Sequence, residues 1–283
     1  MKSNKALAMP YVVWMAVFVV APLLLIVLYA FTSKTGGFTL ANFSTMNQYL
    51  GVFGNSFFLA IIATVICILL GYPLAYFLAR SGEFIRGIAT MLIMLPMWMN
   101  FLLRTYSWMS LLEDTGLINK LLQNIGFFTL WNSIFGTDLA FFHMINTPGA
   151  VVLGMVYNYL PFMVLPIFSV IVKIDPKVIE AAQDLGADSR KVFRRITFPL
   201  SLPGVLSGVT MVFIPSVSTF VITKLLGGGM TMMLGDLIEM QFLGAAYNPY
   251  LGAAISLVMM VIVLVAMTIM NRFGEGEEEA LLL

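Results

Sequence analysis

Long uncharged runs divide the chain, and the charged residues gather between them. A helix rises about 1.5 Å per residue, so about 20 apolar residues cross a hydrocarbon core of about 30 Å. The runs lack the period-two alternation of the strands in a membrane β-barrel. The pattern therefore predicts an all-α integral membrane protein with six transmembrane helices, at about residues 9–31, 55–79, 87–112, 148–172, 204–226 and 250–271.

Composition agrees with this fold class. Of the 283 residues, 60% are apolar and 10% are charged, whereas a soluble domain has about 25% charged residues. The polar groups are too few to cover a water-facing surface, which excludes a soluble enzyme and a disordered chain. The net charge is +1, so no overall field attracts nucleic acid. We expect one transmembrane domain over residues 1–273 and a loose acidic tail over 274–283.

The distribution of lysine and arginine predicts the orientation of the helices. With the N-terminus inside, the cytoplasmic segments hold eleven basic residues, and the outer loops hold only Lys34, Lys120 and Lys224. Cytoplasmic loops of membrane proteins carry this kind of excess. The first apolar run is too long for a cleavable signal, so we expect it to remain as the first span. Both termini are therefore expected in the cytoplasm.

The chain offers little material for an active site. With His143 as the only histidine, a metal cluster or a Ser-His-Asp triad has little to build on. Cys67 is the only cysteine and is expected to be a small buried residue. The glycines at 227–229 are followed by Met230, not by the lysine of a phosphate-binding loop. We expect no enzyme activity, so any energy from nucleotide hydrolysis comes from another chain.

The cytoplasmic segment 173–203 is long and rich in charge. Asp175 and Pro176 are typical of a helix start, and Gly186 suits the left-handed residue that ends a helix. Asp188 can cap a second helix, which a proline near the end of the segment is expected to terminate. These features predict a helix–turn–helix that is either a docking surface or a solvated amphipathic loop.

The same segment resembles the EAA loop of ABC importer permeases, EAA-x3-G-x9-I-x-L-P. Phe198 stands where the pattern usually has leucine, and the matching residues are Glu180, Ala181, Ala182, Gly186, Ile196 and Pro199. The resemblance implies the type I ABC importer permease fold. It also implies that this loop, between the fourth and fifth of six spans, is a cytoplasmic coupling helix for a separate ATPase.

The resemblance further implies an assembly in a bacterial inner membrane. A second permease subunit would complete the translocation path as a heterodimer, two ABC ATPase subunits would lie below, and an extracytoplasmic substrate-binding protein would dock above. This chain would then bind no cofactor, and the partner ATPase would hold ATP and Mg. No nucleic acid is implied.

A finer similarity extends over nearly the whole chain. Residues 70–79, 95–98, 103–106 and 160–163 are similar to the permease subunits of spermidine/putrescine importers. We therefore expect a polyamine permease. Permeases for sulfate, molybdate, iron or opines share much of this scaffold and remain alternatives. An ion-coupled secondary transporter is a more distant alternative, because such proteins place ionisable residues at mid-membrane and only Arg104 lies inside a span here.

The third predicted span carries candidates for the substrate path. Asn100, Arg104 and Trp108 are spaced i, i+4, i+8, which places them on one face of a continuous helix. Either this face lines a water-filled path between two permease chains, or Arg104 extends to the lipid headgroups. Trp98 is either an aromatic wall for a substrate or an ordinary packing residue.

The fifth predicted span combines Pro215 with three hydroxyl residues, Ser216, Ser218 and Thr219. A proline inside a span frees a carbonyl that hydroxyl groups or water can satisfy. The pattern fits a broken helix beside a cavity, and it also fits an ordinary membrane helix, in which proline is common.

The outer loops carry five acids against three bases, and Asp236 and Glu239 are three residues apart on a predicted outer helix. Ammonium groups bind carboxylates and aromatic rings, so an acidic entrance suits a polyamine. A solvated outer face or a docking site for the binding protein would carry the same charges. The long outer loop 113–147 is expected to lie partly on the membrane surface.

Overall fold

The computed structural model describes residues 5–244 and 246–281, and it forms helices without any β-strand over that part of the chain. Five helical segments are long and apolar enough to cross a membrane, and a sixth crossing results if the bent pair α5 and α6 is one span. The predicted all-α membrane fold is confirmed. The helices that form the spans are α1 (Lys5–Met15), α2 (Ala21–Ala30), α4 (Leu50–Arg80), α5 (Glu83–Trp98), α6 (Phe101–Leu112), α9 (Pro148–Ile171), α12 (Phe198–Ser218) and α15 (Pro249–Leu281).

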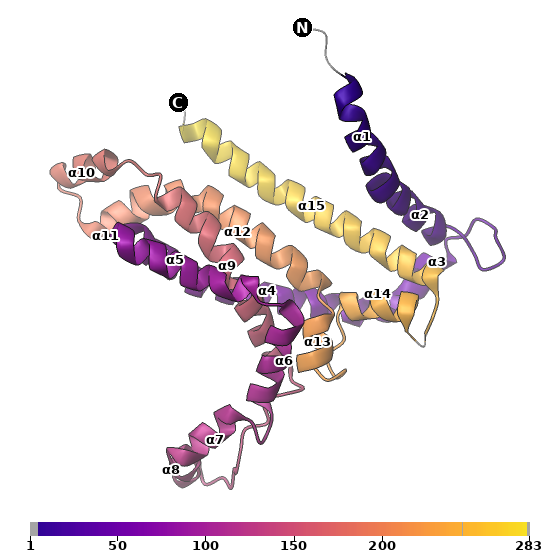
Figure 1. The fold of residues 1–283 in the computed structure, drawn as a ribbon, viewed down its shortest axis with the longest axis horizontal. Coiled ribbons are helices and arrows are strands. Elements are labelled where there is room, and N and C mark those ends of the chain that lie inside the picture. The colour runs from indigo at the N-terminus through magenta and orange to yellow at the C-terminus, as the bar shows by residue number, and fades with distance from the viewer. Residues whose placement is uncertain (1–4, 245, 282–283) are drawn as a thin grey trace.

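The other helices are short and lie in the connections between the spans. They are α3 (Ala41–Thr45), α7 (Leu117–Asn124), α8 (Phe127–Phe135), α10 (Pro176–Asp184), α11 (Ser189–Val192), α13 (Val221–Leu226) and α14 (Leu234–Leu243). Figure 1 shows α10 and α11 at one end of the molecule and α13 and α14 towards the other.

Helices α4, α9 and α12 pack together at the centre of the bundle (Figure 1). Small residues let them approach closely: a Cβ atom added to Gly204 on α12 would lie 2.9 Å from the carbonyl oxygen of Pro166 on α9. A Cβ atom added to Gly71 on α4 would lie 2.9 Å from the Met163 side chain. Close packing of this kind drives helix association in membranes. Cys67 is fully buried on α4, as expected for a small core residue.

The first span stands apart from this centre. Its α1 and α2 are joined by a π-helical turn over Ala16–Val20, and its apolar window is 0% buried within the chain. Only α2 packs closely on another span, which is α15, while α1 diverges from it (Figure 1). The first span therefore presents most of its apolar surface to its surroundings.

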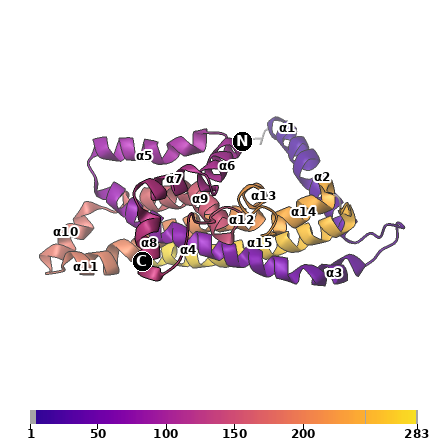
Figure 2. The same cartoon turned by 90° about the horizontal axis from the view of Figure 1, so that it is seen from below.

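The third span is not the continuous helix that the sequence predicts. The axis turns by 93° between Glu83–Trp98 and Phe101–Asn124. Figure 2 shows α5 along one side of the bundle, and Figure 1 shows α6 leaving the bundle in another direction. Met99 and Asn100 have extended backbone angles, and Pro96 has already removed one helical hydrogen bond from the end of α5. These residues break the span.

The expected helix over 204–226 is wrong at both ends. The helical path already begins at Ser189 and passes Pro199 without a stop. A π-helical turn over Phe193–Thr197 precedes the proline, and in it the Phe198 N–H bonds to the Phe193 carbonyl. The wider turn makes room for the proline ring, which would clash with a carbonyl of the preceding turn in a regular α-helix. The helix then stops at Ser218, well before the predicted end.

The last span also differs from the expected one. Helix α15 continues to Leu281, across most of the segment 274–283 that the composition suggests is a loose tail. Residues 282–283 of that segment lie outside the described part of the chain.

Candidate translocation path and coupling segment

The coupling segment, residues 173–203, contains the two helix caps that its sequence predicts. The Asp175 carboxylate accepts a hydrogen bond from the Lys177 backbone N–H at 2.9 Å and caps α10. The Asp188 carboxylate accepts one from the Lys191 backbone N–H at 2.8 Å and caps α11. Local sequence therefore determines where both helices begin.

Gly186 forms the turn between these helices. Its φ is +81°, in the left-handed region, and its backbone N–H bonds to the carbonyl of Gln183 at 2.8 Å. The next N–H, of Ala187, bonds to the carbonyl of Ala182 at 3.0 Å, which completes the closure of the α10 end. No atom lies within 4 Å of a Cβ added at Gly186, so backbone conformation alone favours glycine at this position.

Three of the six EAA-motif residues line one hollow of about 360 Å³ between α10 and α11, and they are Ala182, Gly186 and Ile196. Of the other three, Glu180 and Ala181 are exposed on α10, and Pro199 is half-buried at the start of α12. Leu185, which the sequence analysis did not single out, also lines this hollow and is 90% exposed. Because Lys191 and Arg195 also line the hollow, the segment presents acidic, basic, small and apolar side chains on its surface.

Aromatic side chains fasten the coupling segment to α4. The hydroxyl groups of Tyr72 and Ser201 lie 2.8 Å apart. The rings of Tyr72 and Tyr76 lie edge-on to Phe193, with centroids 5.9 and 5.3 Å away. The Arg80 guanidinium lies 4.5 Å from the centroid of the Tyr76 ring. A movement of the coupling segment therefore has to carry α4 with it or break this cluster.

The candidates of the third span do not share one face. Trp98 ends α5 and is 72% exposed. Asn100 precedes α6, and its side-chain oxygen caps that helix by accepting from the Leu102 backbone N–H at 2.8 Å. The expected alignment of Asn100, Arg104 and Trp108 on one continuous helix is therefore wrong, because Asn100 lies before the start of α6.

Arg104 and Trp108 are turned towards the rest of the chain. Arg104 is 8% exposed, and the centroid of the Phe101 ring lies 6.0 Å from its Cζ. Its Nε and Nη1 find no hydrogen-bond partner among the described residues. Trp108 packs edge-on against Tyr157 on α9, with centroids 5.2 Å apart. Arg104 is thus a buried cation and does not extend outwards from the chain.

The hydroxyl residues near Pro215 satisfy the backbone where α12 ends. Ser216 is fully buried and donates to the carbonyl of Val212 at 2.7 Å, and Ser218 donates to that of Ile214 at 3.2 Å. Thr219 is buried, and its extended backbone separates α12 from α13. The helix therefore ends three residues after Pro215.

Asp236 and Glu239 are both engaged within the chain. Asp236 is 7% exposed and accepts hydrogen bonds from the Thr223 hydroxyl at 2.7 Å and from the Met233 N–H at 2.9 Å. Burial raises the pKa of the Asp236 carboxyl above its usual range. Glu239 pairs with Lys224 at 2.6 Å. The two carboxylates join α14 to α13, so neither stands free at an entrance.

Asn158 is a polar residue of the bundle that the sequence analysis passed over. It is 2% exposed, and its Nδ2 donates to the carbonyl of Gly154 at 2.8 Å. Its Oδ1 has no partner in the described part of the chain. An amide in the middle of an apolar run is costly in lipid, and this signal in the run 148–172 would have identified it.

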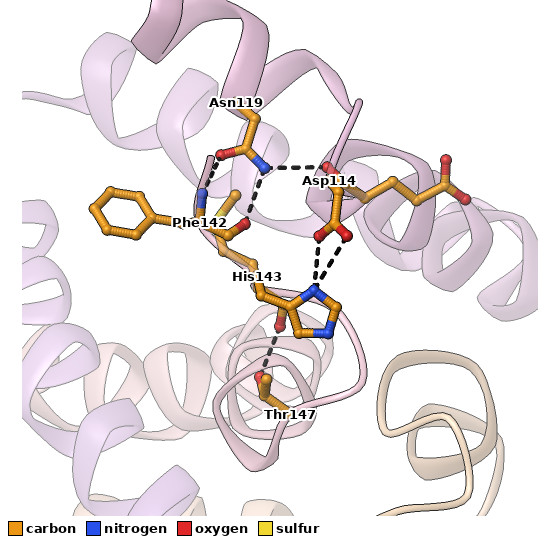
Figure 3. Close-up of polar contacts among 7 residues, drawn as sticks. Asp114, Asn119, Phe142, His143 and Thr147 are labelled. Atoms are coloured by element: carbon orange, nitrogen blue, oxygen red, sulfur yellow. Dashed lines mark hydrogen bonds and ion pairs between the residues drawn. The ribbon is translucent and has the colours of Figure 1, made fainter. Parts of the chain in front are cut away.

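The outer loop 113–147 folds into a lobe that contains α7 and α8 (Figure 1). Figure 3 shows Asn119 at its base, where the side chain donates to the Phe142 carbonyl and accepts from the Phe142 N–H, both at 3.0 Å. Nearby, His143 Nδ1 lies 2.9 Å from a carboxylate oxygen of Asp114. These contacts tie the two ends of the lobe together.

Comparison with known proteins places the chain in a family. Residues 68–276 match the family described as binding-protein-dependent transport system inner membrane component. The chain is 35% identical over 269 residues to the spermidine/putrescine transport system permease protein PotB of Salmonella typhimurium strain SL1344, with 92% of this chain and 90% of that protein covered. The inner membrane ABC transporter permease protein YdcU of Escherichia coli strain K12 is 28% identical over 219 residues, with 76% and 69% covered.

Solved structures share the fold at lower identity. A bacterial ABC transporter involved in the import of the acidic polysaccharide alginate matches with a TM-score of 0.77 at 19% identity, over 95% of this chain and 94% of that one. The MetNI methionine ABC transporter in an inward-facing conformation matches with a TM-score of 0.57 at 16% identity, over 83% and 98%. The predicted type I permease fold is thereby confirmed. The chain belongs to the family of binding-protein-dependent transport system inner membrane components, as a non-catalytic permease subunit of an ABC importer.

Proposed function

We propose that this permease imports polyamines of the spermidine and putrescine type. The observation that carries the proposal is the 35% identity to PotB over 92% of the chain, which includes the central bundle and the coupling segment. A second permease subunit completes the path, and an extracytoplasmic binding protein delivers the substrate. Two ATPase subunits hold ATP and Mg. Both termini face the cytoplasm, in agreement with the eleven basic residues of the cytoplasmic segments.

In this proposal α10 is the coupling helix and inserts into a groove of an ATPase subunit. Its exposed Glu180 and the apolar Leu185 beside Gly186 offer a charged and a hydrophobic contact. The aromatic cluster around Tyr72 and Phe193 transmits the movement of the segment to α4. Packed side chains of this kind can carry energetic coupling between distant sites.

The substrate path runs beside α6, α9 and the break after α12. The unpaired Asn158 Oδ1 is an acceptor for an ammonium N–H, whereas the buried guanidinium of Arg104 disfavours a cation that rests close to it. Transport needs a site that binds its substrate weakly enough to release it. In this proposal the Asn158 Oδ1 attracts the ammonium group and the Arg104 charge weakens its binding. Trp98, Trp108, Ser216, Ser218 and Thr219 shape this region, and Asp236 and Glu239 brace its outer side.

Uptake by the reconstituted complex tests the proposal. The permease is assembled with its partner subunits in proteoliposomes, and uptake of labelled putrescine, spermidine, sulfate and molybdate is measured with ATP and binding protein present. We expect ATP-dependent uptake of the polyamines alone. A complex whose ATPase cannot hydrolyse ATP is the control. Transport of sulfate or molybdate in place of polyamines would transfer the assignment to those solutes, and uptake driven by an ion gradient without ATP would contradict the mechanism.

A further inference from the structure

A cavity of about 330 Å³ lies at the cytoplasmic end of the bundle and is separate from the hollow between α10 and α11. The ends of α4 and α9, the start of α10 and the π-helical turn before α12 all contribute to its wall. Its volume is at the low end of the range of roughly 300–1,000 Å³ found for small-molecule sites. The lining residues that matter here are Arg80, Arg86, Ile174, Pro176, Ile179 and Thr197.

Two arginines give the cavity a positive charge. The Arg86 Nη2 donates to the carbonyls of Ala79 and Ser81 at 3.2 and 3.1 Å, and these bonds fix its guanidinium against the end of α4. Arg80 is held by its contact with the Tyr76 ring. No carboxylate forms an ion pair with either arginine among the described residues. The cavity therefore holds two positioned cations without a counter-charge.

Two hydrogen-bonding groups of the same cavity are unsatisfied. Thr197 is 1% exposed, and its Oγ1 has no partner within residues 5–244 and 246–281. The Nε–H of Arg86 is also buried without an acceptor there. Leaving such a group unpaired costs about 1–3 kcal/mol, and more for a charged one. A guanidinium N–H and a hydroxyl can both donate, so the missing ligand is an acceptor and, beside two arginines, an anion.

The position of the cavity favours a phosphate group as the anion. It lies where α4 and α9 leave the membrane, and Ile174 and Ile179 line it together with the arginines. The cytoplasmic leaflet carries anionic phospholipids, and basic pockets between membrane helices bind their headgroups. Arginine matches the geometry of phosphate with paired N–H groups. The only acid in the adjoining loop, Asp175, is turned to the cap of α10.

We propose that this cavity binds a phosphate group through Arg80, Arg86 and Thr197. The source is either the headgroup of an anionic phospholipid or soluble phosphate. Because Pro176 and Ile179 belong to α10, an occupied cavity braces the coupling helix from behind. Occupancy would then make the coupling of ATP hydrolysis dependent on the anion, and this consequence alone rests on the proposed function.

Native mass spectrometry of the complete complex tests the binding. The purified importer is exposed to phosphatidylglycerol or phosphatidylcholine, and the lipid retained per complex is counted. The Arg80→Gln/Arg86→Gln variant removes the charge from the cavity, and Arg190→Gln/Arg194→Gln removes two charges from exposed positions of the coupling segment as the control. We expect wild type and control to retain phosphatidylglycerol, and the cavity variant to lose affinity for it at least about tenfold, since charge-assisted contacts are removed.

A second arm identifies the source of the phosphate. Inorganic phosphate is added in the absence of anionic lipid, and its binding is measured by equilibrium dialysis. Binding of inorganic phosphate that is lost in the cavity variant assigns the site to soluble phosphate, whereas retention of lipid alone assigns it to the headgroup. Equal retention of both ligands by wild type and the cavity variant would overturn the proposal, as would a wild type that binds neither.

Thr197→Val keeps the proposal testable if the double variant fails to assemble. Valine has nearly the shape of threonine and leaves the charge unchanged, so the partner subunits should still copurify. We expect retention of the phosphate ligand to fall at least about tenfold, the loss of one hydrogen bond to a charged group. Unchanged retention in this variant would also overturn the assignment. Neither measurement depends on polyamine uptake, so a failure here is distinguishable from a failure of the proposed function.

Discussion

The hydroxyl of Tyr72 on α4 lies 2.8 Å from the hydroxyl of Ser201 on α12, and both side chains are buried. Ser201 also donates to the carbonyl of Phe198 at 2.9 Å, which leaves Tyr72 as the donor between the two. The residues are 129 positions apart. This bond joins α4 to the start of α12, at the end of the coupling segment.

Tyr72→Phe removes this bond while keeping the ring. We expect the free energy of unfolding of the complex to fall by about 1 kcal/mol, the net worth of a typical hydrogen bond. Thermal unfolding of Tyr72→Phe, Ser201→Ala and the double variant measures it as a cycle. Because both single variants break the same bond, the double variant should lose less than the sum of the two. Full additivity would mean that the hydroxyls do not interact.

Gly186→Ala strains the turn between α10 and α11. A non-glycine residue in the left-handed region costs about 1–2 kcal/mol, and the space around the new Cβ is open, so the loss is purely conformational. We expect polyamine uptake and substrate-stimulated ATPase activity to fall at least about tenfold, because the helix pair no longer closes. Gly82→Ala is the matched control, since its φ is −60° and nothing lies near its Cβ. Equal activity of both variants would show that the turn does not set the coupling geometry.

Asp236 makes the stability of the outer side depend on pH. The native pKa of its carboxyl is raised above the ordinary 3.8 by burial, so the native state binds the proton more tightly than the unfolded state. Its contribution is therefore fully present below pH 3.8 and is lost as the pH rises through the native pKa. We expect Asp236→Asn to flatten the fall of Tm over this range, and Glu239→Gln, at a partly exposed ion pair, to leave it nearly unchanged. An unchanged slope in Asp236→Asn would contradict the assignment.

Asn158→Leu separates a structural role from a role in the path. The substitution nearly conserves volume and removes an unpaired acceptor, so the Tm of the complex should stay constant or rise. Polyamine uptake should fall about tenfold if its Oδ1 receives an ammonium group. Ser207→Ala, which removes an exposed hydroxyl bonded to its own helix, is the control for loss of a polar group. A parallel loss of Tm and uptake would indicate that Asn158 acts only in packing.

Cysteine labelling tests the orientation of the chain. On a Cys67→Ala background, single cysteines at Ser189 and Ser133 probe the coupling segment and the outer lobe. Ser133 suits this purpose because it is exposed, whereas the neighbouring Asn132 bonds to the backbone of Leu139 and its replacement would disturb the lobe. A membrane-impermeant maleimide should label position 133 in intact spheroplasts and position 189 only after permeabilisation. Labelling of position 189 from outside would reverse the predicted topology.

Much of the fold could be predicted from local signals. The caps at Asp175 and Asp188 and the turn at Gly186 lie where the sequence places them, because each depends on a few adjacent residues. The break between α5 and α6 was missed. Apolar residues predominate on both sides of it, and the backbone at Met99 and Asn100 distinguishes a bent span from a straight one.

The sequence by itself determined that this is a multi-span α-helical membrane protein with a coupling segment, because the transfer of apolar runs into lipid and the capping of helices are local effects. Only the tertiary structure decided what its polar side chains do. Asn100 caps its own helix, Asp236 joins two short helices, and the Asn158 acceptor finds no partner in the described part of the chain. The physical reason is that a buried polar group is satisfied by whichever partner the packing brings within hydrogen-bond distance, and those partners come from distant parts of the chain.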